Sequence, residues 1–162
     1  MKTAIYPGTF DPITHGHIDV IKKSVNIFDR VIVATTDNIN KNYHFSIGDR
    51  LNIINNSLFK DLKLNKNKIK VIPFDKLTID LCKKYNAGTI IRGLRAVSDF
   101  EYEFQLAGMN KKLNSKIETM FLMSDVENQI ISSKFVKEIA NLGGNIDRFV
   151  TKSTAKELKN KL

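Results

Sequence analysis

The sequence is poor in the side chains that build disulfide frameworks and metal centres. Its 162 residues include one cysteine, Cys82, and three histidines. A single cysteine cannot form a disulfide within the chain, and this usage is typical of a reducing compartment, so we expect a cytoplasmic protein. Three scattered histidines and one cysteine do not make a protein metal cage, so we predict no metal-ligating residues.

Long apolar runs, internal repeats and linkers are missing as well. No apolar run approaches the ~20 residues that a helix needs to cross a bilayer, so we expect no membrane partner. The first residues lead directly into a strand pattern, without the basic segment, apolar segment and cleavage site of an exported protein. The length suits one core, and the sequence therefore predicts a single domain over residues 1–162.

Acidic residues are the minority among the charged ones. The chain has 26 Lys and Arg against 17 Asp and Glu, a formal charge of +9. Such an excess can indicate nucleic-acid binding, but no basic stripe with interleaved aromatics, no zinc spacing and no RNP-type strand accompanies it. We therefore expect no nucleic-acid partner and interpret the lysines as a solvated surface. A basic pocket for a polyphosphate needs only a few of them.

Apolar periodicity alternates between strand and helix patterns along the chain. This alternation predicts an α/β fold, a Rossmann-like doubly wound parallel sheet of about five strands, with a C-terminal helical segment. Ser46 ahead of Asp49 predicts a helix cap, and Gly143 with Gly144 predicts a helix stop. The expected strands lie at 2–6, 30–35, 70–73, 89–91 and 119–123, and the expected helices at 17–28, 47–59, 78–85, 100–112, 133–142 and 154–161.

The most informative segment is 9–17, Thr-Phe-Asp-Pro-Ile-Thr-His-Gly-His, which follows the apolar run at 4–6. A strand that passes through this turn into a helix places backbone N–H groups at the helix start, where they bind anions. Gly16 has no Cβ and would let a phosphate approach the backbone. His17 could donate to an oxygen that gains charge during reaction. The segment suits transfer at the α-phosphate of a nucleotide.

This segment resembles the T/HxGH motif of a nucleotidyltransferase superfamily. Two further blocks follow in the same order, Ile-Arg-Gly-Leu-Arg-Ala-Val-Ser-Asp-Phe-Glu-Tyr-Glu at 91–103 and Ile-Ser-Ser with Val-Lys-Glu at 131–138. Together with Tyr-Pro-Gly-Thr-Phe-Asp-Pro at 6–12, they resemble the bacterial phosphopantetheine adenylyltransferase family over about residues 2–149. Three spaced blocks in one order are far more specific than the first motif alone.

The resemblance implies an activity and its partners. Members of that family transfer the adenylyl group of ATP to 4′-phosphopantetheine, which gives dephospho-coenzyme A and pyrophosphate. The expected cofactor is Mg²⁺ bound with ATP, held mainly by phosphate oxygens and water. The resemblance also implies a homohexamer and coenzyme A as a feedback inhibitor.

The same resemblance assigns roles to individual residues. It implies His17, Thr9 and Lys41 as catalytic residues. For the acceptor it implies Thr9, Lys41, Thr78 and Arg92. For ATP it implies Thr9, Phe10, His17, Gly93, Leu94, Arg95, Glu103, Asn128, Gln129, Ile130, Ile131, Ser132, Ser133 and Lys134.

The sheet topology explains why these separate blocks would meet. In the strand order 3-2-1-4-5, which is taken from the resemblance, strands one and four are neighbours and the chain direction reverses between them. The His-Gly-His turn follows strand one and the Arg-Gly-Leu-Arg turn at 92–95 follows strand four. The Ser-Ser turn at 132–133 follows strand five and opens the next helix. All three are expected to face one crevice.

Ordinary structural interpretations of these residues stay open. His17 could satisfy a helix start, the arginines could be solvated surface, and Glu103 could belong to an acidic helix face. Lys41 lacks the proline that usually follows it in the family, and Lys134 replaces a small hydroxyl residue. Lys134 could add positive charge near the β- and γ-phosphates or point to solvent.

Two other functions remain as alternatives. One is another T/HxGH nucleotidyltransferase, with nicotinamide mononucleotide or glycerol phosphate as acceptor. The second is a nucleotide-binding or RNA-binding module without turnover, which would lack an intact set of Thr9, His17 and Arg92. This chain has all three residues.

Overall fold

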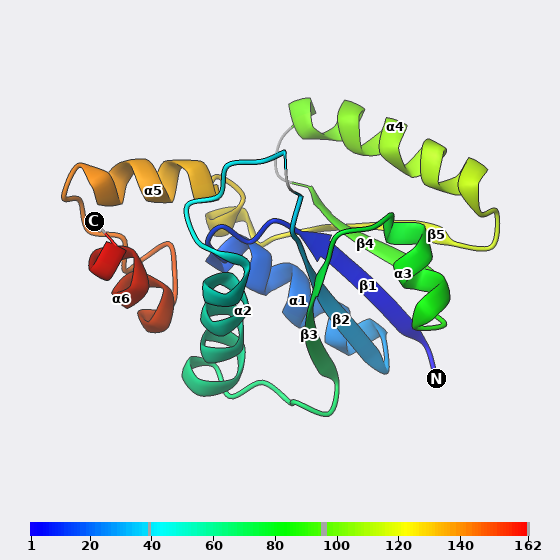
Figure 1. Cartoon of the computed structure of the whole chain (residues 1–162), viewed down its shortest axis with the longest axis horizontal. Helices are drawn as coiled ribbons and strands as arrows, with labels where there is room; N and C mark the ends of the chain where they lie inside the picture. The colour runs from blue at the N-terminus through cyan, green and yellow to red at the C-terminus, as the bar shows by residue number, and fades with distance from the viewer. Residues whose placement is uncertain (39, 95–96, 162) are drawn as a thin grey trace.

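The structure, a computed structural model, describes residues 1–38, 40–94 and 97–161. A five-stranded sheet runs through it in the order β3-β2-β1-β4-β5. Every pair of neighbouring strands is parallel. The predicted fold class and strand order are therefore confirmed, and Figure 1 shows the helices arranged around the sheet.

The observed elements lie close to the expected ranges. Most differences are a shift of one to three residues at an element end, where sequence signals are weakest. The strands are β1 Thr3–Gly8, β2 Arg30–Thr36, β3 Ile69–Phe74, β4 Thr89–Leu94 and β5 Glu118–Met123. The helices are α1 His15–Ile27, α2 Ile47–Asn55, α3 Thr78–Lys84, α4 Val97–Leu113, α5 Ser133–Asn141 and α6 Lys152–Lys161, with short segments η1 Asn56–Asp61 and η2 Val126–Asn128.

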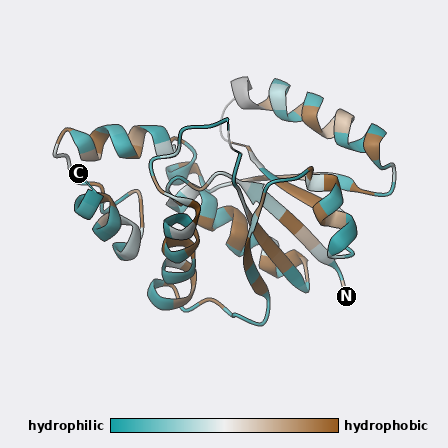
Figure 2. Ribbon diagram, in the orientation of Figure 1, coloured by the Kyte–Doolittle hydropathy of each residue, from teal (hydrophilic) through white to brown (hydrophobic). Residues whose placement is uncertain are grey.

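Apolar side chains cover both faces of the sheet, which is why its central strands are rich in apolar residues. On one face Ala4 and Tyr6 join the larger core with residues of α1, α2, α5 and α6. On the other face Ile5 packs with Ile79 and Cys82 of α3. Burial raises the pKa of the Cys82 thiol to about 12, so this side chain packs as a neutral apolar group. Figure 2 shows hydrophobic residues concentrated along the strands.

The start of α1 differs from the prediction in a way that matters for the site. The helix begins at His15, with Thr14 as its N-cap, rather than at His17. The Thr14 backbone N–H donates to His17 Nδ1 over 3.1 Å. The His17 side chain thus works as the third-residue partner of a capping box, a role that is more often filled by Glu or Gln. Periodicity could not place this boundary, because Thr14, His15 and Gly16 carry no apolar signal.

The predicted helix 47–59 is α-helical only in its first part. From Asn56 to Asp61 the chain is π-helical, and the Leu62 N–H donates to the Ser57 carbonyl, five residues back. This turn brings the Ser57 hydroxyl within 2.7 Å of the Thr151 hydroxyl and 3.1 Å of the Thr154 hydroxyl. A buried polar contact therefore joins η1 to the start of α6.

The two predicted caps are confirmed. Ser46 accepts from the Asp49 N–H at the start of α2. At the end of α5, Gly143 has φ +77°, and the Gly143 and Gly144 N–H groups bond to the carbonyls of Ala140 and Ile139. This is the Schellman arrangement, which requires the left-handed conformation that glycine adopts without strain.

One helix stands apart from the others. In Figure 1, α4 runs above the β4–β5 side of the sheet and projects beyond it. Phe104, Met109 and Leu113 on this helix are each more than half exposed. Across the described ranges, no helix is both long and apolar enough to span a membrane.

Candidate active site

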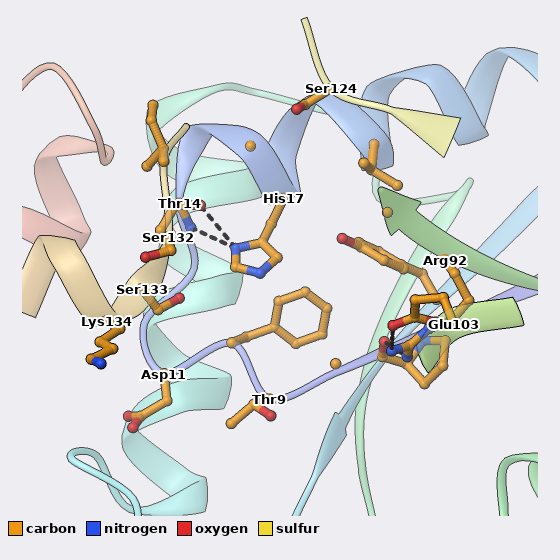
Figure 3. Close-up of a pocket in the computed structure, with 18 of the residues that line it drawn as sticks. Thr9, Asp11, Thr14, His17, Arg92, Glu103, Ser124, Ser132, Ser133 and Lys134 are labelled. Carbon is orange, nitrogen blue, oxygen red and sulfur yellow. Dashed lines mark hydrogen bonds and ion pairs between the residues drawn. The ribbon is translucent and has the colours of Figure 1, made fainter. Parts of the chain in front are cut away.

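A cavity of about 870 Å³ lies at the carboxyl ends of β1 and β4, beside the first turn of α1. This is the crevice that the strand order predicts. Five parts of the described chain line it: the end of β1 with the turn into α1, the loop at 40–43, the end of β4 with part of α4, Ser124 after β5, and the start of α5. Figure 3 shows side chains from the turn after β1, the ends of β4 and β5, α4 and the start of α5 around one space, with His17 near its centre.

The hydrogen bond at His17 determines which ring nitrogen can serve a substrate. Because Nδ1 accepts from the Thr14 N–H, the neutral ring carries its proton on Nε2. The Thr14 hydroxyl also lies 3.0 Å from Nδ1. The ring packs edge-on against Phe10, with 5.1 Å between the centroids. These contacts fix the ring, and its Nε2–H is the donor that a phosphate in the cavity would meet.

Phe10 is buried and adopts φ +48°, an uncommon backbone conformation for a residue with a side chain. Its ring covers Gly8 so closely that a Cβ there would lie 2.7 Å from the ring carbon Cζ. It also packs edge-on against Tyr6 at 5.3 Å. Gly8 is therefore needed for the turn after β1, and Phe10 supports the base of the cavity.

Gly16 is needed for packing as well as for any approach by a ligand. A Cβ at this position would lie 3.1 Å from the carbonyl oxygen of Asn128. The His15 N–H, one of the first-turn donors expected to bind an anion, donates to the Phe149 carbonyl instead. The sequence predicted that a phosphate would approach the backbone at Gly16. In the structure, the segment before α5 also approaches it closely, through the Asn128 carbonyl.

Arg92 and Glu103 lie on the same wall of the cavity and are bound to one another. Arg92 Nε and Nη2 lie 2.6 and 2.5 Å from the two carboxylate oxygens of Glu103. Arg92 Nη1 donates to the Pro7 carbonyl at 3.1 Å. Burial alone would lower the pKa of the guanidinium, but the bonds and charge of Glu103 raise it above its usual value. Arg92 therefore stays charged, with its plane fixed by a bidentate pair.

The loop at 40–43 carries Lys41 to the cavity. Its entry is held by local bonds: the Lys41 N–H donates to the Asn38 carbonyl, and the Asn38 N–H donates to the Tyr43 hydroxyl. Its exit is held by Asp11, whose carboxylate accepts the N–H groups of His44 and Phe45 at 2.8 and 2.9 Å. The loop is therefore tied down at both ends.

Arg50 is fully buried beneath this loop. Its guanidinium donates to the carbonyls of Thr9, Thr36 and Phe45 at 3.0, 2.8 and 3.2 Å. It also pairs with Asp37 and lies 3.9 Å from the centroid of the Tyr43 ring. A single cation thus satisfies the carbonyls at the ends of β1 and β2 and stacks under the loop.

The start of α5 forms the opposite wall. The Ser132 hydroxyl accepts from the Phe135 N–H as the helix cap, which leaves its own O–H to donate. The Ser133 hydroxyl donates to the Pro12 carbonyl at 2.7 Å and so joins α5 to the turn after β1. In Figure 3 both serines lie on the same side of His17 as Thr14, with Lys134 next to them.

The structure brings most of the predicted site residues to this cavity. Those that line it are Thr9, Phe10, His17, Lys41, Arg92, Gly93, Leu94, Glu103, Ile131, Ser132, Ser133 and Lys134. Four do not: Thr78 opens α3, Ile130 is 81 % exposed, the Asn128 amide donates to Asp19, and the Gln129 amide donates to the Ser124 carbonyl. Arg95 lies outside the described residues.

Sequence reasoning missed Asp11, Arg50 and Lys137. Lys137 lines the cavity from the second turn of α5, and its ammonium lies 3.0 Å from Asp11. Asp11 lies in the first block that carries the family resemblance and Lys137 lies in the third, but the resemblance assigned no role to either residue. Arg50 had no signal, because a lone arginine on a predicted helix is normally solvated.

The charges around the cavity favour an anionic ligand. Lys41, Arg92, Lys134 and Lys137 line it, against Asp11 and Glu103. Both carboxylates are already paired with cations of the wall. Within the described ranges, no group of three or more His, Cys, Asp or Glu could hold a metal ion. A metal ion here would depend on phosphate oxygens rather than on a protein cage.

Comparisons with known proteins agree with this arrangement. The family model described as cytidylyltransferase-like matches residues 5–139. The phosphopantetheine adenylyltransferase of Pelagibacter ubique is 66 % identical over 160 residues, which cover 99 % of this chain and 98 % of that protein. The enzyme of the same name from Vesicomyosocius okutanii is 48 % identical over 161 residues and covers 99 % of both chains. That from Legionella pneumophila is 49 % identical over 158 residues, 98 % of this chain and 90 % of that protein.

One solved structure with the same fold is more distant in sequence. A Plasmodium falciparum nicotinic acid mononucleotide adenylyltransferase complexed with APC superimposes with a TM-score of 0.74 at 18 % identity, over 98 % of this chain and 94 % of that one. This likeness concerns the fold alone. The full-length identities and the family match, together with the three sequence blocks gathered at one cavity, show that the chain belongs to the phosphopantetheine adenylyltransferase family, within the cytidylyltransferase-like nucleotidyltransferases.

Proposed function

We propose that this protein transfers the adenylyl group of ATP to 4′-phosphopantetheine, producing dephospho-coenzyme A and pyrophosphate. The observation that carries the proposal is the convergence of His17, Arg92 and the Ser132–Ser133 turn on one cationic cavity in a chain of this family. No nucleophilic side chain is required, because the acceptor phosphate supplies the attacking oxygen.

The reaction forms one bond and breaks one. A phosphate oxygen of 4′-phosphopantetheine attacks the α-phosphorus of ATP, and the bond from that phosphorus to the oxygen bridging to the β-phosphate breaks. The electron pair leaves with pyrophosphate. Both reactants are anions, so the protein must hold like charges together and stabilise the charge that builds on the α-phosphate oxygens.

The cavity residues divide this work. His17, through Nε2–H, is assigned to the α-phosphate, where charge increases only during transfer. Lys41, Thr9 and Arg92 are assigned to the acceptor, and Lys134 with the Ser132 hydroxyl to the β- and γ-phosphates. Gly93 and Leu94 at the end of β4, with Phe10, are assigned to the rest of the nucleotide. Thr78, Asn128, Gln129, Ile130 and Arg95 keep their proposed binding roles from the family resemblance alone.

We expect the nucleotide to arrive as its magnesium complex. Enzymes of this reaction class use a divalent metal ion with the nucleotide, where it neutralises phosphate charge. Asp11 and Glu103, the carboxylates of the cavity wall, are held in ion pairs, so they are poor candidates for direct ligands. Mg²⁺ is therefore best treated as part of the substrate.

The acceptor is tested by measuring pyrophosphate release with ATP, Mg²⁺ and a panel of phosphorylated acceptors. We expect 4′-phosphopantetheine to give far faster release than nicotinamide mononucleotide or glycerol phosphate. The His17→Ala variant is the control that ties the release to this cavity. Equal turnover with either rival acceptor would overturn the assignment, and ATP binding without release from any acceptor would favour a binding module.

Three further expectations accompany the proposal. The family resemblance implies a homohexamer, and the exposed apolar side chains of α4 are consistent with self-association. It also implies inhibition by coenzyme A, which shares the pantetheine arm of the acceptor. We expect the protein in the cytoplasm, where ATP is available and where its single thiol would stay reduced.

A further inference from the structure

The Asp11 carboxylate is the point where three walls of the cavity are joined. Asp11 belongs to the turn after β1 and is 5 % exposed. Its oxygens accept the N–H groups of His44 and Phe45, at the exit of the loop that carries Lys41. One of the same oxygens accepts the ammonium of Lys137, on α5. A single side chain therefore connects the turn, the loop and the helix.

The three partners make Asp11 a charged acceptor rather than a proton donor. Burial alone would raise the pKa of its carboxyl, but the His44 and Phe45 N–H groups and the Lys137 ammonium outweigh it and lower the pKa below the usual value. A carboxylate with all of these donors has no proton to give and little capacity to take one. Its contribution to the site must come from geometry.

Lys137 contacts Asp11 and lines the cavity at the same time. Its side chain is 26 % exposed and lines the cavity, while one of its ammonium protons is directed to Asp11. An ammonium has three donors, so two remain for a phosphate. Lys137 lies one helical turn after Ser133, which itself donates to the Pro12 carbonyl next to Asp11. The Asp11 contact thus directs this lysine along the inner side of α5.

We propose that Asp11 is a positioning residue that holds the Lys41 loop against α5 and holds the Lys137 ammonium at the cavity wall as an additional cation for the polyphosphate. Arg50 clamps the entry side and floor of the loop, and Asp11 clamps its exit. With both clamps in place, Lys41 on one wall and Lys137 on the other keep a fixed separation. The part of this proposal in which Lys137 binds the polyphosphate of ATP rests on the proposed function.

The first test measures the loop without any substrate. Hydrogen exchange of the His44 and Phe45 amides is compared in the wild type, Asp11→Asn and Lys137→Gln. An asparagine can accept only through its oxygen and presents an NH₂ group to the second amide. We expect exchange at both amides to rise roughly ten-fold or more in Asp11→Asn, as for the loss of a hydrogen bond to a charged group, and by less in Lys137→Gln.

The second test measures the substrates separately. We expect Asp11→Asn to raise the KM of the acceptor roughly ten-fold or more, and Lys137→Gln mainly to weaken ATP binding. Because Asp11 acts on ATP through Lys137, Asp11→Asn should also weaken ATP binding, and in the double variant the two losses of ATP affinity should be less than additive. Lys83→Gln, which removes a lysine from an exposed pair on α3, is the matched control.

The outcomes separate this proposal from the assignment of the acceptor. The proposal would be overturned if the exchange of the His44 and Phe45 amides were unchanged in Asp11→Asn. It would also be overturned if Lys137→Gln lost the same ATP affinity in the presence and in the absence of Asp11. If Asp11→Asn fails to fold, Asp11→Glu and Lys137→Gln still decide, since partial recovery of slow exchange by the longer carboxylate is expected only if the charge holds the loop. A different preferred acceptor would leave the exchange result standing.

Discussion

The His17 side chain has two tasks in this structure, and a substitution must be chosen to separate them. Its Nδ1 accepts from the Thr14 N–H at the start of α1, and its Nε2–H is proposed to act on the α-phosphate. Removing one transition-state donor costs roughly 10²- to 10³-fold in turnover, or about 3 to 4 kcal/mol. We expect His17→Ala to lower kcat by at least that factor while the dissociation constant of ATP changes only a few-fold.

His17→Asn is the matched variant. The asparagine oxygen can still accept from the Thr14 N–H but cannot replace the distant ring nitrogen. We expect His17→Asn to lose as much kcat as His17→Ala but to keep more thermal stability. Thermal unfolding measures the stability, and calorimetry measures the dissociation constant of ATP. A variant with near-normal kcat and lost ATP binding would show that His17 is a binding or structural residue.

At the residue scale, the sequence predicted positions better than partners. His17, Arg92 and the two serines were expected at one crevice, because each follows a strand of a parallel sheet. The bidentate pair between Arg92 and Glu103 was not expected, since one was assigned to the acceptor and the other to ATP. They lie eleven positions apart on two consecutive elements, β4 and α4, and no local pattern encodes such a contact. The roles of Asp11 and Arg50 were hidden for the same reason.

At the scale of elements, the end of α5 offers a direct test of backbone conformation. Gly143 has φ +77°, and a Cβ there would meet no atom within 4 Å, so any cost of Gly143→Ala comes from the backbone alone. We expect a loss of about 1 kcal/mol in the free energy of unfolding, measured by urea or thermal denaturation.

Gly88→Ala is the control for this prediction. A Cβ at Gly88 also meets nothing within 4 Å, and its φ is not in the left-handed range. Its effect should stay within about 0.5 kcal/mol, as for other surface substitutions. Equal effects of the two alanines would mean that the Schellman turn does not depend on glycine.

Element types were predictable because strand and helix patterns alternate clearly, whereas boundaries and irregular helices were not. The start of α1 was placed two residues late, since Thr14 and His15 give no periodic signal. The π-helical turn of η1 was included in one continuous helix, because its apolar residues Leu58 and Phe59 fit a helical pattern. What distinguishes this turn is the contact of Ser57 with Thr151 and Thr154, just before and within the first turn of α6 and almost a hundred residues later.

At the scale of the whole molecule, the uncovered face of α4 predicts association. Tyr102, Phe104, Met109 and Leu113 are each exposed by 55 % or more on this one helix. Tyr102, Met109 and Leu113 share one side of the helix, and exposed apolar side chains grouped in this way mark interfaces. We expect light scattering to give a mass near that of six 18.4 kDa chains.

A charge on this face should prevent assembly. Met109→Glu and Leu113→Glu are expected to shift the protein to smaller species, because a carboxylate cannot be buried without a partner. Ile27→Glu, at an exposed apolar position on α1, is the control and should leave the mass unchanged. A monomeric wild type at micromolar concentration would contradict the hexamer.

The sequence alone could not predict this face, because the apolar residues of α4 do not show whether they pack inward or outward.

The π-helical turn of η1 also bears on how this chain can change length over evolution. An α-helix advances about 100° per residue, so deleting one residue from Asn56–Asp61 would rotate the following residues by roughly that angle relative to α2. Deletion of Asn56 would move Ser57 away from Thr151, and deletion of any residue before Asp61 would move Asp61 away from the Ser153 N–H and hydroxyl. Substitution of a side chain in η1 has a local effect, whereas deletion of one residue there would break the polar contacts that join η1 to α6. We infer that related chains vary in this turn by substitution and keep its residue count.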